Sequence, residues 1–375
     1  MTQNNLIKTL KYKSLNNNTM NIIFLYPAVR NVPNGGLKVV YDYANRLAND
    51  GYDISIVYAS YFPDNDKGFM GMFKSVLKYI YQIGYRKIKG CSWYKLHPKI
   101  KELFVWKYNQ KNVPSGNYIL ATAVTTAKYA DSLPNFGRRL YIIQDFETFI
   151  ANSEEYIYNS YRLPLIKIAI SNWIKDLVDQ YSPSPSELVV NGFNFKKYYL
   201  TIPIQNKSKH LVSMLYHIRP AKGTPTAFEA LRLAKQKIPD LEVNMFGVYN
   251  APKELPKWIH YIQNPTEMQH LEINNQAAIY LGCSIMEGWG LTIGEAMMCG
   301  QAVVCTDNKG YLEMAKDGYN ALVAPVGDSQ TLANNIVRLI TDDNLRYQIA
   351  SNGLTYIRQF DIEESYRKLK NILEK

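Results

Sequence analysis

The stretch from Ser284 to Gly300 constrains the fold more than any other part of this sequence. An apolar run over residues 277–281 precedes it, and a second apolar run over 302–305 follows it. Between the two runs lie several glycines and a short helical pattern over 291–298. This order predicts a strand, a glycine-rich turn, a helix and a second strand, which together form one unit of an α/β sheet.

Three glycines of this turn, Gly288, Gly290 and Gly294, are predicted to let backbone amides approach a ligand, because glycine carries no side chain. The helix predicted to begin at Leu291 presents free N–H groups at its amino end, and such an end favours an anion. The turn therefore predicts phosphate binding.

Two carboxylates, Glu287 and Glu295, flank the turn. A carboxylate accepts protons from hydroxyl groups, so both residues suit the hydroxyls of a nucleotide or sugar better than its phosphates. Two alternatives remain open at this point. Thr292 and Glu295 have the spacing of a capping box, which needs no ligand, and Glu287 fits an ordinary loop carboxylate.

The whole string, Ser-x-x-Glu-Gly-Trp-Gly-Leu-x-x-x-Glu-Ala-Met-x-x-Gly, resembles the donor-site signature of retaining family 4 glycosyltransferases. The resemblance implies the GT-B fold, in which two doubly wound, Rossmann-like α/β domains face each other across a cleft. It also implies a nucleotide-sugar donor, with neither a metal nor another cofactor. The donor contacts implied in this stretch are Glu287, Gly288, Trp289, Gly290, Leu291, Thr292 and Glu295.

The length of 375 residues favours two domains. The run from Ser182 to Ser186 alternates serine and proline and breaks regular structure, so it marks the boundary. We expect a disordered polar tail over 1–19, a first domain over 20–185 and a second over 186–355. By resemblance, a final helix over 356–375 returns to the first domain.

The first domain opens with a predicted strand over 21–26, the pair Gly35-Gly36, a helix over 37–49 and a strand over 54–58. In the resembling family a glycine pair at this place lets the loop approach the donor or the acceptor. The alternative is a turn that merely starts the helix.

A strand predicted over 140–143 ends at Gln144-Asp145-Phe146-Glu147. Polar groups at the carboxyl end of a parallel strand face the ligand crevice, so we assign Asp145 to the catalytic site. The passage from Tyr141 to Tyr181 is similar to bacterial rhamnosyltransferases of S-layer and capsular glycan synthesis. The alternative is that Asp145 and Glu147 cap the next helix.

The second domain opens with a predicted strand over 211–216, a basic loop and a helix over 225–236. Arg219 and Lys222 lie on that loop and suit a diphosphate, Arg as a planar fork and Lys as a point charge. In the widespread family pattern His217 stands at the position of an arginine, whereas Arg219-Pro220 matches the rhamnosyltransferase subgroup. We favour Arg219 as the phosphate ligand, but the choice between His217 and Arg219 is open.

The net charge of +11 is concentrated in residues 67–111, where eleven Lys or Arg face one acid, Glu102. Aromatic and aliphatic residues alternate with these basic ones. The pattern predicts peripheral contact with an anionic membrane, and a solvated helical face is the alternative. We expect no nucleic-acid partner, because no nucleic-acid-binding motif accompanies the charge.

Four cysteines without metal-ligand spacing and the lack of a secretory leader predict a cytoplasmic protein, acting at the inner face of the membrane if it meets lipid. The predicted activity is transfer of a sugar, rhamnose from dTDP-rhamnose, to a cell-surface glycan or lipid-linked acceptor. The alternatives are a UDP- or GDP-hexose donor, a GT-B epimerase or phosphorylase, and a non-catalytic binding partner of the same fold.

Overall fold

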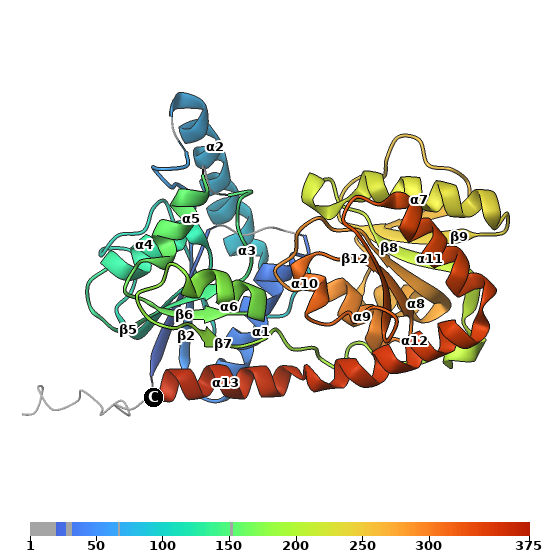
Figure 1. The fold of residues 1–375 in the computed structure, drawn as a ribbon. Helices are drawn as coiled ribbons and strands as arrows, with labels where there is room; N and C mark the ends of the chain where they lie inside the picture. Colours follow the sequence, from blue (N-terminus) through green and yellow to red (C-terminus); the bar gives the residue numbers. More distant parts are fainter. Residues whose placement is uncertain (1–19, 28–31, 67, 151–152) are drawn as a thin grey trace, which may run out of the picture.

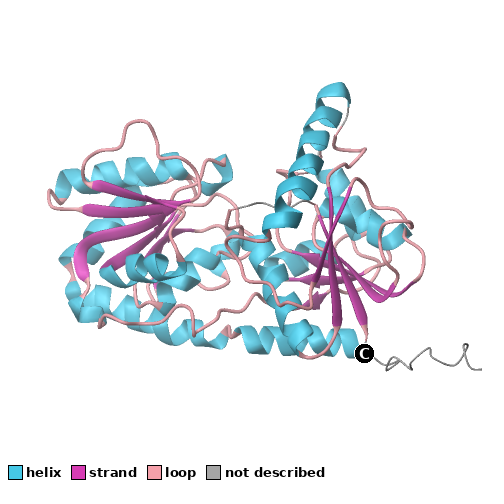
Figure 2. Ribbon diagram, turned by 180° about the vertical axis from the view of Figure 1, so that it is seen from behind, coloured by secondary structure: helices cyan, strands magenta, loops and turns pink. Residues whose placement is uncertain are grey.

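The computed structural model of the chain describes residues 20–27, 32–66, 68–150 and 153–375, without the side chain of Lys89. The tail predicted over 1–19 therefore lies outside the described residues, as does Lys67. Two parallel sheets, each covered by helices, form two domains side by side (Figure 1). Figure 2 shows the same two sheets from behind.

The first domain holds a seven-stranded parallel sheet in the order β3-β2-β1-β4-β5-β6-β7. Its strands are β1 (Asn21–Tyr26), β2 (Asp53–Ala59), β3 (Lys101–Val105), β4 (Gly116–Ala121), β5 (Phe136–Ile143), β6 (Ile166–Ala169) and β7 (Glu187–Leu188). Its helices are α1 (Gly35–Asn49), α2 (Gly68–Tyr81), the π-helical turn η1 (Gln82–Arg86), α3 (Lys87–Lys89), α4 (Val124–Ser132), α5 (Glu154–Tyr161) and α6 (Asn172–Asp179).

The second domain holds a six-stranded parallel sheet in the order β10-β9-β8-β11-β12-β13. Its strands are β8 (Ser208–Leu215), β9 (Glu242–Gly247), β10 (Ile259–Gln263), β11 (Ala277–Gly282), β12 (Ala302–Thr306) and β13 (Ala321–Ala324). Its helices are η2 (Ile204–Asn206), η3 (Pro220–Lys222), α7 (Thr224–Lys237), α8 (Glu267–Gln276), α9 (Leu291–Met298), α10 (Lys309–Leu312), α11 (Ser329–Thr341) and α12 (Asp343–Tyr356).

The central strands explain the core of each domain. The sequence of β1, Asn-Ile-Ile-Phe-Leu-Tyr, is apolar at consecutive positions, and β11 is buried at every residue. Such strands need cover on both faces, which the flanking helices provide. In both sheets, residues at the carboxyl ends of central strands line the space between the domains, which is where ligands bind in open α/β sheets.

The chain returns to the first domain at its end (Figure 1). After α12 and the short turn η4 (Ile357–Gln359), helix α13 (Ile362–Glu374) runs beneath the first sheet. The hydroxyl of Tyr118 donates to the carbonyl of Leu373 at 2.6 Å, and the ammonium of Lys370 pairs with Asp50 at 2.6 Å. These contacts hold the end of the chain on the first domain.

The boundary predicted at Ser182 to Ser186 lies slightly before the end of the first sheet. Strand β7, Glu187–Leu188, follows that boundary and pairs with β6. The first sheet thus extends past residue 185, and the chain crosses between the sheets over 189–207.

Among the described residues, none of the helices combines the length and apolarity required to span a bilayer.

Candidate active site

A cavity of about 2010 Å³ lies between the two domains. It is lined by the ends of β1, β4 and β5 on one side and by the loops after β8 and β11 on the other. All the site residues predicted from the sequence line this cavity. They are Gly35, Gly36, Asp145, Arg219, Lys222, Glu287, Gly288, Trp289, Gly290, Leu291, Thr292 and Glu295.

Lys222 and Glu287 form a close ion pair on the second-domain side. The ammonium of Lys222 lies 2.7 Å from each carboxylate oxygen of Glu287. The hydroxyl of Ser284 donates to the same carboxylate at 2.7 Å. These two donors fix the orientation of the Glu287 carboxylate, and its charge keeps the Lys222 ammonium at the cavity wall.

Arg219 and His217 have different environments. The Arg219 guanidinium stacks at 4.1 Å on the ring of Phe149, which belongs to the first domain. The His217 ring accepts the Arg219 backbone N–H at 2.9 Å through Nδ1, and its Nε2 lies 3.4 Å from the Tyr249 hydroxyl. Both ring nitrogens of His217 thus have protein partners, whereas the guanidinium keeps its N–H edge for a ligand.

Helix α9 begins in the predicted place, but without a capping box. Its N-cap is Gly290, which has a φ of 99°, a left-handed conformation that favours glycine. Thr292 therefore lies inside the helix, and the Glu295 carboxylate accepts a hydrogen bond from the ammonium of Lys38 at 2.9 Å instead of capping α9.

The glycines of this turn fit closely against protein atoms. A Cβ added to Gly288 would lie 2.0 Å from the carbonyl oxygen of Gln144, across the cleft. A Cβ on Gly294 would lie 2.1 Å from the ring of Phe193. Gly35, in the first domain, similarly faces Leu291, at 3.3 Å from an added Cβ. Gly35 and Gly288 thus permit close packing between the two domains, and Gly294 permits packing against the segment that connects them.

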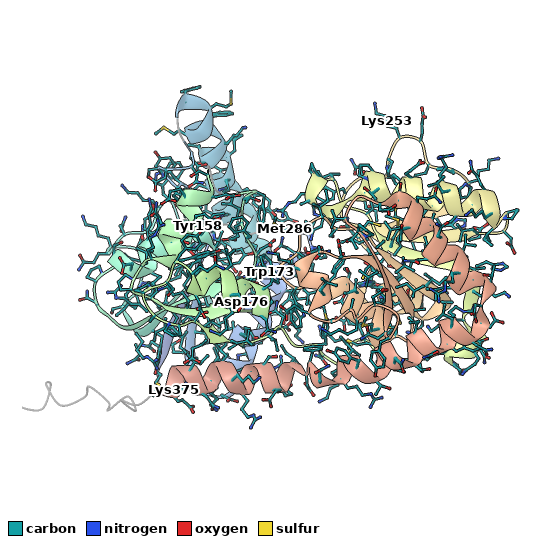
Figure 3. All side chains as sticks on the ribbon, in the orientation of Figure 1. Tyr158, Trp173, Asp176, Lys253, Met286 and Lys375 are labelled. Atoms are coloured by element: carbon teal, nitrogen blue, oxygen red, sulfur yellow. The ribbon has the colours of Figure 1, made fainter. Side chains whose placement is uncertain are left out.

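The ring of Trp289 is also a packing element. It is 2% exposed and meets Phe360 edge-on, with ring centroids 5.1 Å apart. A second tryptophan, Trp173 of α6, donates from Nε1 to the carbonyl of Gly288 at 3.0 Å. Figure 3 marks Trp173 and Met286 where the two domains meet. No local sequence pattern indicates this contact, since Trp173 lies over a hundred residues from the motif.

Lys38 is the main site residue that the sequence analysis missed. It lies on α1, three residues after Gly35, and reaches across the cleft to Glu295. Burial opposes its charge, but the Glu295 carboxylate, together with Asp42 and Glu267, raises the pKa of Lys38 overall. The position of Lys38 just after the glycine pair was the available signal.

Asp145 and Glu147 provide two buried carboxyls on the first-domain side. Burial, with a contribution from the Glu287 charge, raises the pKa of Asp145 to about 7. Burial also raises the pKa of Glu147 to about 8. The predicted alternative, that these residues cap the next helix, is wrong. Ser153 caps α5, and Glu147 instead accepts the N–H of Val124 at the start of α4.

One Asp-x-Asp sequence, Asp64-Asn65-Asp66, was overlooked in the sequence analysis. Asp64 pairs with Lys128, and Asp66 accepts the N–H of Phe62 at 2.8 Å, so the two carboxylates are bound separately. Across the part of the chain that the structure describes, no group of three or more His, Cys, Asp or Glu side chains is placed to hold a metal ion.

Comparisons with known proteins agree with this geometry. Residues 202–355 match the family model of glycosyl transferases group 1. An uncharacterized glycosyltransferase of Methanocaldococcus jannaschii is 23% identical over 220 residues, which are 55% of this chain and 58% of that protein. The N,N'-diacetylbacillosaminyl-diphospho-undecaprenol alpha-1,3-N-acetylgalactosaminyltransferase of Campylobacter jejuni is 29% identical over 114 residues, 30% of either protein. The chain thus spans less than two thirds of the length of these relatives.

Solved structures resemble both domains of the chain. The structure of Anabaena HepE with UDP and glucose superimposes with a TM-score of 0.70 at 18% identity, covering 95% of this chain and 99% of that one. Sucrose-phosphate synthase from Thermosynechococcus elongatus gives a TM-score of 0.70 at 15% identity, covering 95% and 98%. Residues 202–355 are thus similar to the group 1 glycosyl transferases, and the two domains together have the GT-B fold.

Proposed function

We propose that this protein transfers a sugar from a nucleoside diphosphate sugar to an acceptor hydroxyl, with retention of the anomeric configuration. One observation carries the proposal. The Lys222–Glu287 pair, at 2.7 Å, lies with Arg219 and the first residues of α9 on one wall of a cavity between the domains. A nucleoside diphosphate leaving group needs positive charge and aligned N–H groups at this place.

The proposed roles follow the chemistry of each group. Arg219, Lys222 and the backbone amides of residues 290–292 bind the diphosphate, so that no metal cofactor is required. Glu295 accepts a hydrogen bond from a hydroxyl of the nucleotide's sugar. Glu287 accepts hydrogen bonds from hydroxyls of the transferred sugar. Gly35 and Gly36 bring the first domain close to the donor, and Asp145 lies opposite Glu287.

The proposed step breaks the bond between the anomeric carbon and the phosphate oxygen while the acceptor oxygen bonds to the same face of that carbon. The acceptor's proton moves to the departing phosphate oxygen, so atoms and charge balance without a protein nucleophile. Residues that stabilise the leaving diphosphate therefore contribute most of the rate.

For the donor, we propose dTDP-rhamnose. Two stretches support it, Gln144 to Glu147 and Arg219-Pro220, because both are similar to the rhamnosyltransferase subgroup. The Anabaena neighbour was solved with UDP and glucose, so a UDP-hexose is the first competitor. A GDP-hexose is the second.

For the acceptor, we propose a growing glycan or a lipid-linked saccharide at the inner face of the cytoplasmic membrane. The name of the Campylobacter relative includes a diphospho-undecaprenol carrier, and another relative, the O-antigen chain mannosyltransferase B of Escherichia coli, is 31% identical over 106 residues, 28% of this chain and 27% of that protein. Peripheral membrane contact through residues 67–111 would bring the enzyme to such an acceptor.

Thermal unfolding with dTDP, UDP and GDP, and then with their sugar conjugates, tests the donor. A ligand that binds only the folded state stabilises it by about 2.7 kcal/mol at a hundred times its dissociation constant. We expect dTDP and dTDP-rhamnose to give the largest shift. Preference for UDP or GDP would discard rhamnose, and no shift with any nucleotide would favour a non-catalytic binding protein.

A further inference from the structure

Residues 68–89, which form α2, η1 and α3, project from the first domain as one helical arm (Figures 1 and 2). We call them the projecting arm. Its apolar side chains are unusually accessible, with Phe69 84% exposed and Ile88 74% exposed. The exposed large apolar residues of the arm are Phe69, Met70, Met72, Phe73, Val76, Leu77, Ile80, Tyr81, Ile83, Tyr85 and Ile88.

The arm has the reverse polarity of an ordinary surface helix. An ordinary surface helix turns its apolar stripe toward the core. In the arm, the buried side chains are instead the small or polar ones, Ser75, Gln82 and Arg86. Gln82 accepts a hydrogen bond from the Ser60 hydroxyl at 3.2 Å. The apolar face therefore points away from the protein and is suited to a partner that is itself apolar.

Two of the basic side chains counted in residues 67–111 are paired with acids in the structure. The Arg86 guanidinium is 1% exposed and pairs with Glu102, and Lys101 pairs with Asp53 at 2.9 Å. The Arg86 side chain is therefore not available to an anionic surface, and the charge of Lys101 is partly compensated by Asp53. On the arm itself, Lys74 and Lys87 remain exposed among the apolar residues.

The charge of the arm decides between two apolar partners. The sequence has no Asp or Glu between residues 67 and 101, so a second copy of the arm would bring like charges together. An anionic lipid bilayer offers an apolar interior beneath a negative surface. That combination fits exposed Phe, Leu and Ile side chains flanked by lysines.

We propose that the projecting arm inserts its apolar face into an anionic lipid bilayer. The root of the arm borders the cavity, since Lys78 lines it. Docking of the arm would thus place one rim of the cavity near the lipid surface. That last step rests on the proposed function, and it makes the acceptor a saccharide carried on a lipid.

Vesicle flotation tests the insertion directly. The parent protein is compared with a variant carrying Phe69→Ser, Phe73→Ser, Leu77→Ser and Ile80→Ser, which removes one stripe of the apolar face. The control carries Met268→Ser and Val326→Ser, two exposed apolar residues of the second domain. Vesicles of phosphatidylglycerol with phosphatidylcholine are compared with phosphatidylcholine alone, at low and high salt.

We expect the parent and the control to float with the anionic vesicles, and the arm variant to partition at least about tenfold less. A variant with Lys74→Gln and Lys87→Gln should lose less vesicle binding than the arm variant. High salt should reduce the binding of the parent to a similar extent, because it screens the lysine charges. Equal flotation of parent and arm variant would overturn the proposal. The proposal would also be overturned if the parent protein did not bind vesicles but formed a dimer, and if the arm variant did not form that dimer.

Titration of the same preparations with dTDP, UDP and GDP separates this proposal from the proposed function. Vesicle binding without nucleotide binding would leave the arm as a membrane anchor and discard the transferase. Unchanged nucleotide binding and thermal unfolding in the arm variant would show that the loss of flotation is not a loss of folding.

Discussion

The two walls of the cleft hold their charged groups in different ways. On the second-domain wall, Lys222 and Glu287 lie 2.7 Å apart, so each charge is compensated by its partner. On the first-domain wall, Asp145 and Glu147 are carboxyls whose pKa values burial raises to about 7 and about 8. The second-domain wall is therefore preorganised for an ionic ligand. The first-domain wall changes its charge near neutral pH.

The largest predicted effect is a change in the free energy of unfolding at Glu147. The buried carboxyl of this residue is one of the features that distinguish the first-domain wall from the second. The folded protein binds the Glu147 proton more tightly than the unfolded chain does. As a result, the free energy of unfolding falls as pH rises from about 4.3 toward the folded pKa of about 8. Glu147→Gln removes this loss and keeps an oxygen to accept the Val124 N–H. We expect the variant to gain about 3 kcal/mol over the parent at pH 7 relative to pH 4.

Urea unfolding of parent and Glu147→Gln at the two pH values measures that gain. A difference between the proteins that is independent of pH would mean that Glu147 is ionised in the folded state. The first-domain wall would then carry a fixed charge, like the second.

A second prediction sharpens the role of the second-domain wall. Glu287→Gln keeps the size of the side chain but removes the charge that orients Lys222. We expect turnover to fall about a hundredfold with a smaller change in the donor KM, because the lost contact acts on the reacting sugar. Glu267→Gln is the control, since Glu267 also lines the cavity but pairs with Lys197. Equal turnover in the parent and Glu287→Gln would remove Glu287 from the reaction.

The smallest predicted effect is on nucleotide affinity and concerns the Lys38–Glu295 ion pair, which joins the two walls. Lys38 uses one position on the carboxylate, which has room for about four hydrogen bonds, so a ribose hydroxyl can bind beside it. We expect Lys38→Met to raise the dissociation constant of the nucleoside diphosphate about fivefold, because Glu295 loses its orientation. Lys38→Arg should restore most of the affinity. Tighter binding in Lys38→Met would mean that Lys38 competes with the donor.

The second-domain wall was largely predictable from the sequence, and the first-domain wall was not. Helix α9 has the predicted bounds, 291–298, because the glycine turn and two flanking apolar strands lie within thirty residues of one another. The Lys38–Glu295 pair joins residues 257 positions apart, and no local pattern records which residues meet across a cleft. The GT-B fold was thus predicted, but the contacts between its domains had to come from the structure.

The projecting arm shows a second limit. Composition indicated a basic, apolar segment over 67–111, but it could not show which of its side chains face the protein. Arg86 counts toward the net charge and yet lies buried against Glu102. A variant in which every basic residue of 67–111 is replaced would therefore lose a buried ion pair of the first domain as well as surface charge.

Calorimetric titration of dTDP into the parent, the Arg219→Ala plus Lys222→Ala variant and His217→Ala tests the central claim most directly. The account predicts one nucleotide per chain, with the double variant weakened at least about tenfold, since charge-assisted hydrogen bonds contribute roughly 1.5–3 kcal/mol each. His217→Ala should bind nearly as well as the parent, because its ring nitrogens have protein partners. Full affinity in the double variant, or loss of binding in His217→Ala alone, would contradict the assignment of the diphosphate to Arg219 and Lys222.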